Sequence, residues 1–151
     1  MDFDFEIGKA IELHSGTDIT VIACGRTVLS ALEAAEIAEQ QGTTVRVLDM
    51  HTLKPIDEDA IIKAVTDTRR IITVEDHNVM GGLGSAVCEV IASSGKGCAV
   101  RRLGLQDEFA IVGYPEDLLH HYKIDADGIL EAIAEVMKMD FEEDEDWEDD
   151  S

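Results

Sequence analysis

The chain has 151 residues, of which 45% are hydrophobic and 30% charged, a composition typical of one globular domain rather than of a disordered or fibrous chain. Its formal net charge is −21, from 12 Lys plus Arg and 33 Asp plus Glu, whereas binding to the phosphate backbone of nucleic acids needs the opposite sign. No apolar run approaches the roughly 20 residues of a membrane span, and the N-terminus is acidic where a secretory signal is basic. We therefore expect a cytoplasmic protein with neither nucleic-acid nor membrane partners.

Short β-branched segments alternate with longer helical ones from the start of the chain. An edge strand is expected over 7–13 and a strand over 18–24, followed by a helix of about four turns that starts near Val28 and ends before Gly42. A further strand is expected over 44–50. After it, Asp57 is placed to cap a helix that carries Ile61, Ile62 and Val65 on one face.

The second half of the chain continues the alternation. Strands are expected over 70–75 and 98–103, with a helix between them whose apolar positions are 83, 87, 90 and 91, and a last helix over 126–139. Strands that alternate with helices of this length pair in parallel with right-handed crossovers, so the pattern predicts a three-layer α/β/α sandwich over residues 1–139. Residues 140–151 hold nine acids and no base, and we expect them to be a disordered acidic tail.

The cysteines and histidines do not predict a disulfide framework or a metal site. Cys24, Cys88 and Cys98 are odd in number, far apart and form no C-x-x-C pair, so we interpret them as buried thiols. The histidines lack the spacing of metal ligands and are expected on the surface or in loops: His14, His51, His120 and His121.

A glycine-rich segment, Gly81-Gly82-Leu83-Gly84-Ser85, follows a strand and opens a helix, as dinucleotide-binding loops do. Val87 stands where such a loop has its third glycine, and no Gly-Lys-Ser/Thr follows for a phosphate-binding loop. The favoured interpretation is that small residues let a helix start pack closely against the sheet or a second subunit. The N–H groups of that helix start remain a candidate anion site.

The run Glu75-Asp76-His77 lies at the carboxyl end of a strand, where open α/β sheets place their functional crevice. A hydrolase would need a nucleophile beside this run, and Ser85 lacks the G-x-S-x-G pattern. We expect the carboxylates and the imidazole to hydrogen-bond to loop backbone and hold the Gly81-Gly82 turn, or to contact an interface. Arg101 and Arg102 are candidates for contact with an anion, although one of them is expected to form an ion pair.

The order of motifs along the chain resembles the C-terminal domain of transketolases, and the match runs from about residue 5 to residue 137. The same domain closes deoxyxylulose-phosphate synthase and the β subunit of 2-oxoacid dehydrogenase E1, but Glu75-Asp76-His77 and the closing Tyr114-Pro115-Glu116-Asp117-Leu118-Leu119 with Tyr122 are more similar to transketolase. The motifs that carry the resemblance are Phe5 to Ala10, Gly16 to Gly25, Leu53 to Asp57, Val74 to His77, Gly81 to Ser85 and Leu103 to Phe109.

The resemblance implies a five-stranded mixed sheet of order 1-3-2-4-5 with strand 1 antiparallel. It also implies a thiamine-diphosphate enzyme, a transferase of the pentose phosphate pathway, that moves two-carbon ketol units between phosphosugars. In that family the cofactor and Mg²⁺ are held between two upstream domains through a Gly-Asp-Gly motif and a glutamate. Asp125-Ala126-Asp127-Gly128 is not that motif, so we expect no catalytic, cofactor-binding or metal residue in this chain.

The implied role is structural: a separately cloned domain or the terminal piece of a split transketolase, joined to upstream domains or an N-terminal subunit and forming a homodimer. Contacts are expected from the loops 76–85 and 104–109, so Leu83→Glu should weaken association while the monomer stays folded. The alternatives are a domain of deoxyxylulose-phosphate synthase and, in another class, a stand-alone anion- or nucleotide-binding regulatory module. The interface or loop-anchoring candidates are Glu75, Asp76, His77, Gly81, Gly82, Leu83, Gly84, Ser85, Asp107 and Phe109.

Overall fold

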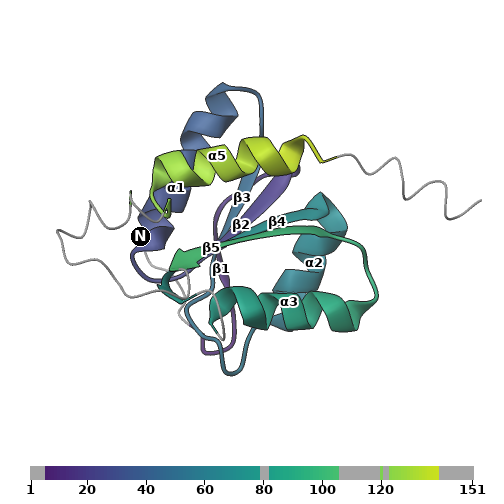
Figure 1. Cartoon of the computed structure of the whole chain (residues 1–151). Coiled ribbons are helices and arrows are strands. Elements are labelled where there is room, and N and C mark those ends of the chain that lie inside the picture. Colours follow the sequence, from purple (N-terminus) through teal and green to yellow (C-terminus); the bar gives the residue numbers. More distant parts are fainter. Residues whose placement is uncertain (1–5, 79–81, 106–119, 121–122, 140–151) are drawn as a thin grey trace, which may run out of the picture.

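A computed structural model describes residues 6–78, 82–105, 120 and 123–139 of the chain. Strands and helices alternate through this part, and two layers of helices enclose one sheet (Figure 1). The elements are β1 (Ile11–His14), β2 (Ile19–Ala23), α1 (Thr27–Gln40), β3 (Val45–Asp49), α2 (Glu58–Thr68), β4 (Arg70–Asn78), α3 (Leu83–Ser94), β5 (Ala99–Leu105) and α5 (Ala126–Met137).

The five strands lie in the order β1-β3-β2-β4-β5. β1 pairs with β3 in the antiparallel direction, and the other neighbours, β3–β2, β2–β4 and β4–β5, pair in parallel. This confirms the predicted five-stranded mixed sheet with an antiparallel first strand. In a sheet of this kind the carboxyl ends of the four parallel strands share one edge, which is where loops from different parts of the chain meet.

The core has two parts, one on each face of the sheet. Residues of a strand point alternately to opposite faces, so Val21 faces α1 and α5 while its neighbour Ile22 faces α2 and α3. Both side chains are fully buried, as expected for a central strand covered on both sides. α1 packs closely on its face because its buried side chains are small: Thr27, Ala31, Ala34, Ala35 and Ala38.

Local sequence signals explain where several elements begin and end. Asp57 caps α2 as predicted, because its Oδ1 accepts the Ala60 N–H at 3.1 Å. Its other oxygen accepts the Ala10 N–H at 2.9 Å, which fixes the segment before β1. α1 ends at Gln40, and Gly42 follows with a φ of +95°, a conformation that glycine adopts without strain.

Several predicted boundaries were wrong: β5, for example, runs to Leu105 rather than ending at residue 103. Two of the differences have a clear physical cause. The first strand starts at Ile11 rather than at residue 7, because Gly8 has a φ of +83° and its N–H bonds to the Thr52 hydroxyl instead of to a strand. β4 continues to Asn78 rather than ending at Glu75, because Asn78 pairs with Leu105 of β5 after a shift in register. Within the described residues, no helix is long and apolar enough to cross a membrane.

Candidate functional site

The carboxyl edge of the sheet is where β4 leads to the start of α3, and Glu75 lies at its centre. Its side chain is 1% exposed. One carboxylate oxygen accepts the Leu83 N–H at 2.9 Å, and the other accepts the Gly84 N–H at 2.8 Å. The first N–H groups of a helix have no partner within the helix and carry partial positive charge, so a carboxylate stabilises them strongly. Glu75 therefore fills the position at which an external anion would bind α3.

The glycine at the start of α3 lies in close contact with side chains of the sheet. A Cβ atom at Gly84 would lie 2.9 Å from Cδ of Arg102 and 2.9 Å from Oγ1 of Thr73. Thr73 is fully buried on β4, and its hydroxyl has no hydrogen-bond partner among the described residues. The segment thus lets a helix approach strands β4 and β5, the packing role that its small residues suggested.

The carboxyl edge carries negative charge, and its cysteine, Cys24, is a poor nucleophile. Burial, followed by the charges of Glu75 and Asp76, raises the pKa of the Cys24 thiol to about 11. Burial also raises the pKa of the Asp49 carboxyl above its usual value, while nearby His51 acts in the opposite direction. A thiol with such a pKa is protonated at neutral pH and is a poor nucleophile. The negative edge would also repel a phosphate group.

The three cysteines are half-buried free thiols, less enclosed than predicted. Cys98 resembles Cys24 in its chemistry, since burial raises the pKa of its thiol to about 11 as well. Cys24 and Cys98 are therefore inert side chains that fill space beside the core cluster under α2 and α3.

Arg101 and Arg102 do not converge on one anion. Adjacent residues of a strand point to opposite faces, and these two side chains reach different helices. Arg101 forms an ion pair with Glu135 of α5 at 2.9 Å. Arg102 lies over the start of α3, where its Nη1 is 3.5 Å from the Ser85 hydroxyl. The expected ion pair is present at Arg101. Contact of either guanidinium group with an anion stays a prediction.

Leu83 belongs to the core of this domain and does not face outward. It is 1% exposed and packs in the cluster formed with Ile22, Ile71 and Val87. The expectation that Leu83→Glu would spare the monomer is therefore wrong, because a carboxylate at this position would be buried among apolar side chains.

Some predicted residues lie outside what the structure describes. Gly81, Asp107 and Phe109 fall in undescribed segments, as do residues 140–151 and the Tyr114 to Leu119 motif. His77 lies in β4, but its side chain is not described, so its relation to Ser85 stays a prediction. Gly82 immediately precedes α3 as its N-cap residue. Asp76 is half-buried beside Gly25.

Sequence reasoning missed a small cluster at the start of α5. His120 Nδ1 lies 2.7 Å from Asp125 Oδ2, and the ligand atoms of His120, Asp125 and Asp127 lie within 4.8 Å of one another. Asp125 also caps α5, because its Oδ1 accepts the Gly128 N–H at 2.9 Å. The positive end of a helix opposes a bound cation, so the geometry favours a cap reinforced by an ion pair. The signal in the sequence was an Asp directly before a helical pattern.

A groove lies between α2 and α3 on the surface of the domain. Its volume is about 480 Å³, and its lining includes Leu53, Ile56, Ile62, Val90 and Ser94. Leu53 is one of the exposed large hydrophobic residues, at 37% exposure. The groove begins beside the 53–57 loop, which follows the carboxyl end of β3, and it runs along α3 to Ser94.

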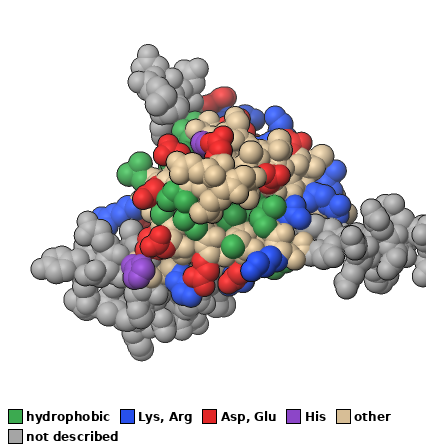
Figure 2. Space-filling model, turned by 90° about the horizontal axis from the view of Figure 1, so that it is seen from above, with side chains coloured by type: hydrophobic (Ala, Val, Ile, Leu, Met, Phe, Trp, Pro, Cys, Tyr) green, Lys and Arg blue, Asp and Glu red, His purple; other side chains and the backbone are tan. Residues whose placement is uncertain are grey.

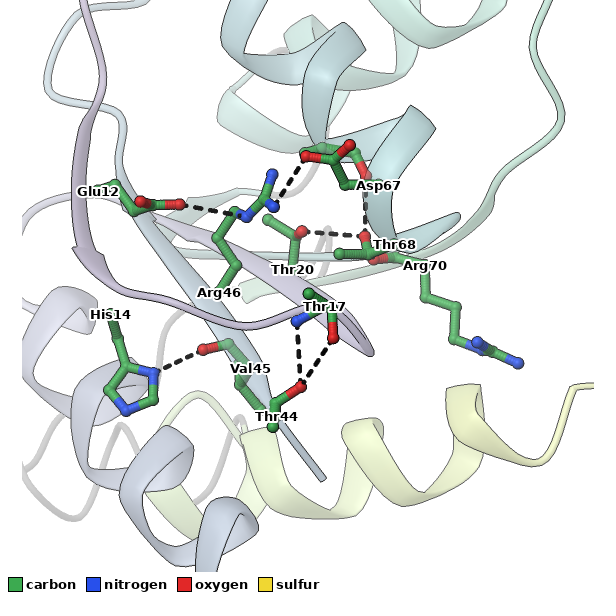
Figure 3. A network of polar contacts seen from close by, with 11 residues as sticks. Glu12, His14, Thr17, Thr20, Thr44, Val45, Arg46, Asp67, Thr68 and Arg70 are labelled. Atoms are coloured by element: carbon green, nitrogen blue, oxygen red, sulfur yellow. Dashed lines mark hydrogen bonds and ion pairs between the residues drawn. The ribbon is translucent and has the colours of Figure 1, made fainter. Parts of the chain in front are cut away.

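At the opposite, amino edge of the sheet a polar network joins β1, β3 and α2 (Figure 3). Arg46 of β3 contacts Glu12 at 3.2 Å and Asp67 at 2.9 Å, so one nearly buried guanidinium connects three elements. Thr20 and Thr68 share a buried hydrogen bond of 3.0 Å below it. This network is structural, because Arg46, Glu12 and Asp67 are paired with one another within the domain.

Comparison with known proteins identifies the domain. A family model described as the transketolase C-terminal domain matches residues 8–129. The chain belongs to this family. A "Putative transketolase C-terminal section" from Methanocaldococcus jannaschii is 46% identical over 134 residues, which are 89% of this chain and 42% of that protein. A subunit of an apulose-4-phosphate transketolase from Phocaeicola vulgatus is 42% identical over 137 residues, 91% of this chain and 43% of that protein.

Other relatives of this transketolase C-terminal domain are longer enzymes. The 1-deoxy-D-xylulose-5-phosphate synthase of Heliobacterium modesticaldum is 37% identical over 89% of this chain and 21% of that protein. Among solved structures, one described as "Split gene transketolase, inactive beta4 tetramer" has a TM-score of 0.84 and 37% identity, covering 89% of this chain and 44% of that one. A transketolase mutant from Pichia stipitis shares the fold alone, with a TM-score of 0.63 and 18% identity. The chain spans less than half the length of the relatives that it matches.

Proposed function

We propose that this chain is the C-terminal part of a thiamine-diphosphate-dependent transketolase-type enzyme that transfers two-carbon ketol units between phosphosugars in the cytoplasm. The observation that carries the proposal is the match of nearly the whole chain to less than half of an apulose-4-phosphate transketolase subunit and of a transketolase C-terminal section. The remaining parts, including an N-terminal subunit, would supply the cofactor site. This domain would supply contacts that hold the assembly together.

The described residues support this division because they do not fit a thiamine diphosphate site. The glycine-rich helix start, the feature most suited to a diphosphate, has its first N–H groups bound by Glu75. Asp49 and Asp76 add negative charge at the same edge. The His120 cluster lies at the positive end of α5, which disfavours a cation, and Asp125 already caps that helix. Cofactor and Mg²⁺ would therefore be held outside this chain.

We place the main contact surface at the carboxyl edge, including Asp76, Ser85 and the groove between α2 and α3. Apolar side chains on its surface, such as Leu53, suit a protein partner. A homodimer of the complete enzyme would use the same edge or the loops beside it.

The deciding experiment is reconstitution. The purified chain is titrated with thiamine diphosphate and Mg²⁺ by calorimetry, alone and after mixing with the upstream transketolase portion from the same source. We expect binding and ketol transfer only in the mixture. Cofactor binding by the chain alone would contradict the proposal, and so would a mixture that forms no complex.

The contact surface has its own test with a matched pair of charge reversals. Asp76→Lys changes the carboxyl edge, and Glu36→Lys makes the same charge change at an exposed position of α1. Because reversed charge at an interface is repulsive, we expect Asp76→Lys to weaken assembly with the upstream portion about tenfold or more, and Glu36→Lys to leave it unchanged. Equal effects of the two variants would argue against this surface.

A second candidate is the C-terminal domain of deoxyxylulose-phosphate synthase, which the 37% identity to the Heliobacterium enzyme favours. The reconstituted mixture distinguishes the two, since formation of 1-deoxy-D-xylulose 5-phosphate would select the synthase. A stand-alone anion-binding module is less well supported, because Glu75 occupies the helix start that it would use. Saturable binding of a phosphorylated ligand by the chain alone would favour that module.

A further inference from the structure

Four basic residues gather at the amino edge of the sheet: Arg69, Arg70, Lys96 and Lys138, named here the basic edge. Arg69 is the C-cap residue that follows α2, and Arg70 is the first residue of β4. The Arg69 carbonyl accepts the Ala99 N–H at 3.0 Å, so the start of β5 lies directly beside them. Lys96 is exposed in the loop that leads into β5.

The end of α5 brings Lys138 to the same edge. Arg101 of β5 pairs with Glu135 of α5. Lys138 lies three residues after Glu135, as the exposed C-cap residue of α5. α5 ends above the start of β4 in Figure 1, and Figure 2 shows Lys and Arg side chains gathered at that right-hand rim. In Figure 3, Arg70 extends away from the Arg46 network toward the side where α5 ends.

Two acidic residues near the basic edge, Asp67 and Asp18, have partners of their own. Asp67 is bound to Arg46 at 2.9 Å. Asp18 accepts the Thr44 N–H at 2.8 Å and its hydroxyl at 3.0 Å. Counted as formal charges, the four basic residues and these two acids leave the edge positive. This contrasts with a chain whose overall charge is −21.

The sequence places a strong negative charge immediately next to this edge. Residues 140–151 follow directly after Met139 and contain nine acids and no base. Twelve residues span up to roughly 40 Å when extended, so they can reach every member of the basic edge. Because residues 1–139 carry 24 acids and 12 bases, most of the remaining surface repels the tail.

We propose that the acidic tail, residues 140–151, docks on the basic edge of its own chain. The attraction is between charges and requires no single conformation of the tail. At 0.1 M salt such interactions act over about 10 Å, and at 1 M salt over about 3 Å, so the docking is salt-dependent. The docked tail would shield the basic edge from polyanions and from acidic surfaces of other proteins.

Trp147 gives a direct test on the full chain, because it is the only tryptophan and lies in the tail. Acrylamide quenching of its fluorescence is compared between the unaltered chain and the variant Arg69→Glu/Lys96→Glu/Lys138→Glu in 0.1 M NaCl. We expect the quenching constant to rise roughly 1.5- to 2-fold in the variant and in the unaltered chain at 1 M NaCl. Circular dichroism checks that each protein is folded.

The matched control reverses three exposed lysines elsewhere, Lys9→Glu/Lys54→Glu/Lys63→Glu, with the same change in net charge. We expect its quenching constant to equal that of the unaltered chain. The proposal is overturned if the basic-edge variant and the unaltered chain are quenched equally at 0.1 M NaCl, or if the control shows the same rise. Shielding that is lost on dilution would place the tail on a second copy and would overturn docking within the chain.

Discussion

Helices α3 and α5 both begin at a carboxylate, and they differ in where that carboxylate comes from. At α3 it is Glu75 of β4, which is almost fully buried and accepts two backbone N–H groups at 2.9 and 2.8 Å. At α5 it is Asp125, the residue directly before the helix, which accepts one N–H at 2.9 Å and meets the exposed His120. The first N–H groups of both helices need partners outside the helix. At α3 the partner comes from a distant strand, and at α5 it comes from the adjacent residue.

The carboxylate at α3 is part of the buried structure of the domain, whereas the one at α5 lies at its surface. Glu75 joins a strand to a helix from another part of the chain, so its loss would disturb the carboxyl edge as a whole. Asp125 acts within its own turn, and water can replace much of what it does. Variants at the two helix starts should therefore differ widely in their effect on the free energy of unfolding.

The largest effect is expected at Leu83, the first residue of α3. A glutamate there places a charge among buried apolar side chains, so Leu83→Glu should cost more than about 4 kcal/mol and leave the domain unfolded at room temperature. The control is Leu29→Glu, because Leu29 is 76% exposed on α1 and should change stability by less than about 0.5 kcal/mol. Urea unfolding followed by circular dichroism measures both. A folded Leu83→Glu monomer would show that this helix start is not part of the core.

Glu75→Gln should have the next largest effect. The amide keeps one acceptor oxygen but turns an NH₂ group toward the second helix N–H, so a buried donor is left without a partner. We expect a loss of about 3 kcal/mol in the free energy of unfolding. Glu89→Gln, at an exposed position of the same helix, is the control and should be nearly neutral. A loss below about 1 kcal/mol for Glu75→Gln would mean that water satisfies the helix start.

Features of the fold that depend on local interactions could be predicted from the sequence, and features that depend on distant residues could not. The strand expected over 18–24 is β2, Ile19–Ala23, and the one over 44–50 is β3, Val45–Asp49, because β-branched runs bounded by polar residues and glycines are local signals. The Asp57 cap was predicted for the same reason. β4 was expected to stop at Glu75 because Asp76-His77-Asn78 lack such a signal, and only pairing with β5 extends it.

The candidate site was predicted in its location but not in its contacts. Glu75 was singled out by its place at a strand end, yet nothing local tells that both of its oxygens bind the start of α3. The apolar spacing 83, 87, 90 and 91 indicated a buried stripe without telling whether Leu83 meets the sheet or a second subunit. The opposite directions of Arg101 and Arg102 follow from the strand period, so they could have been predicted.

Each of the two helix starts also contains a glycine, and for these glycines we expect the larger loss of stability at α5. A Cβ at Gly128 would lie 2.1 Å from the Lys123 carbonyl oxygen, which is backbone and cannot move freely. At Gly84 the nearest atoms belong to side chains, those of the exposed Arg102 and the buried Thr73. Gly128→Ala should therefore cost roughly 2 kcal/mol, while Gly84→Ala should stay within about 1 kcal/mol because alanine favours the helix. Thermal unfolding of the pair measures this, and a larger loss at Gly84 would show that Arg102 and Thr73 are held rigidly.

The smallest effects are expected at the cap of α5. Asp125→Ala removes a local cap and should cost about 1 kcal/mol. His120→Ala removes only an exposed partner of that cap and should cost less than Asp125→Ala. A double-mutant cycle in urea isolates the His120–Asp125 interaction, which we expect to be under about 1 kcal/mol because the imidazole is largely in water. A coupling well above that value would place this ion pair among the structural contacts of the domain, alongside Glu75. The contrast between a buried and an exposed helix start would then no longer hold.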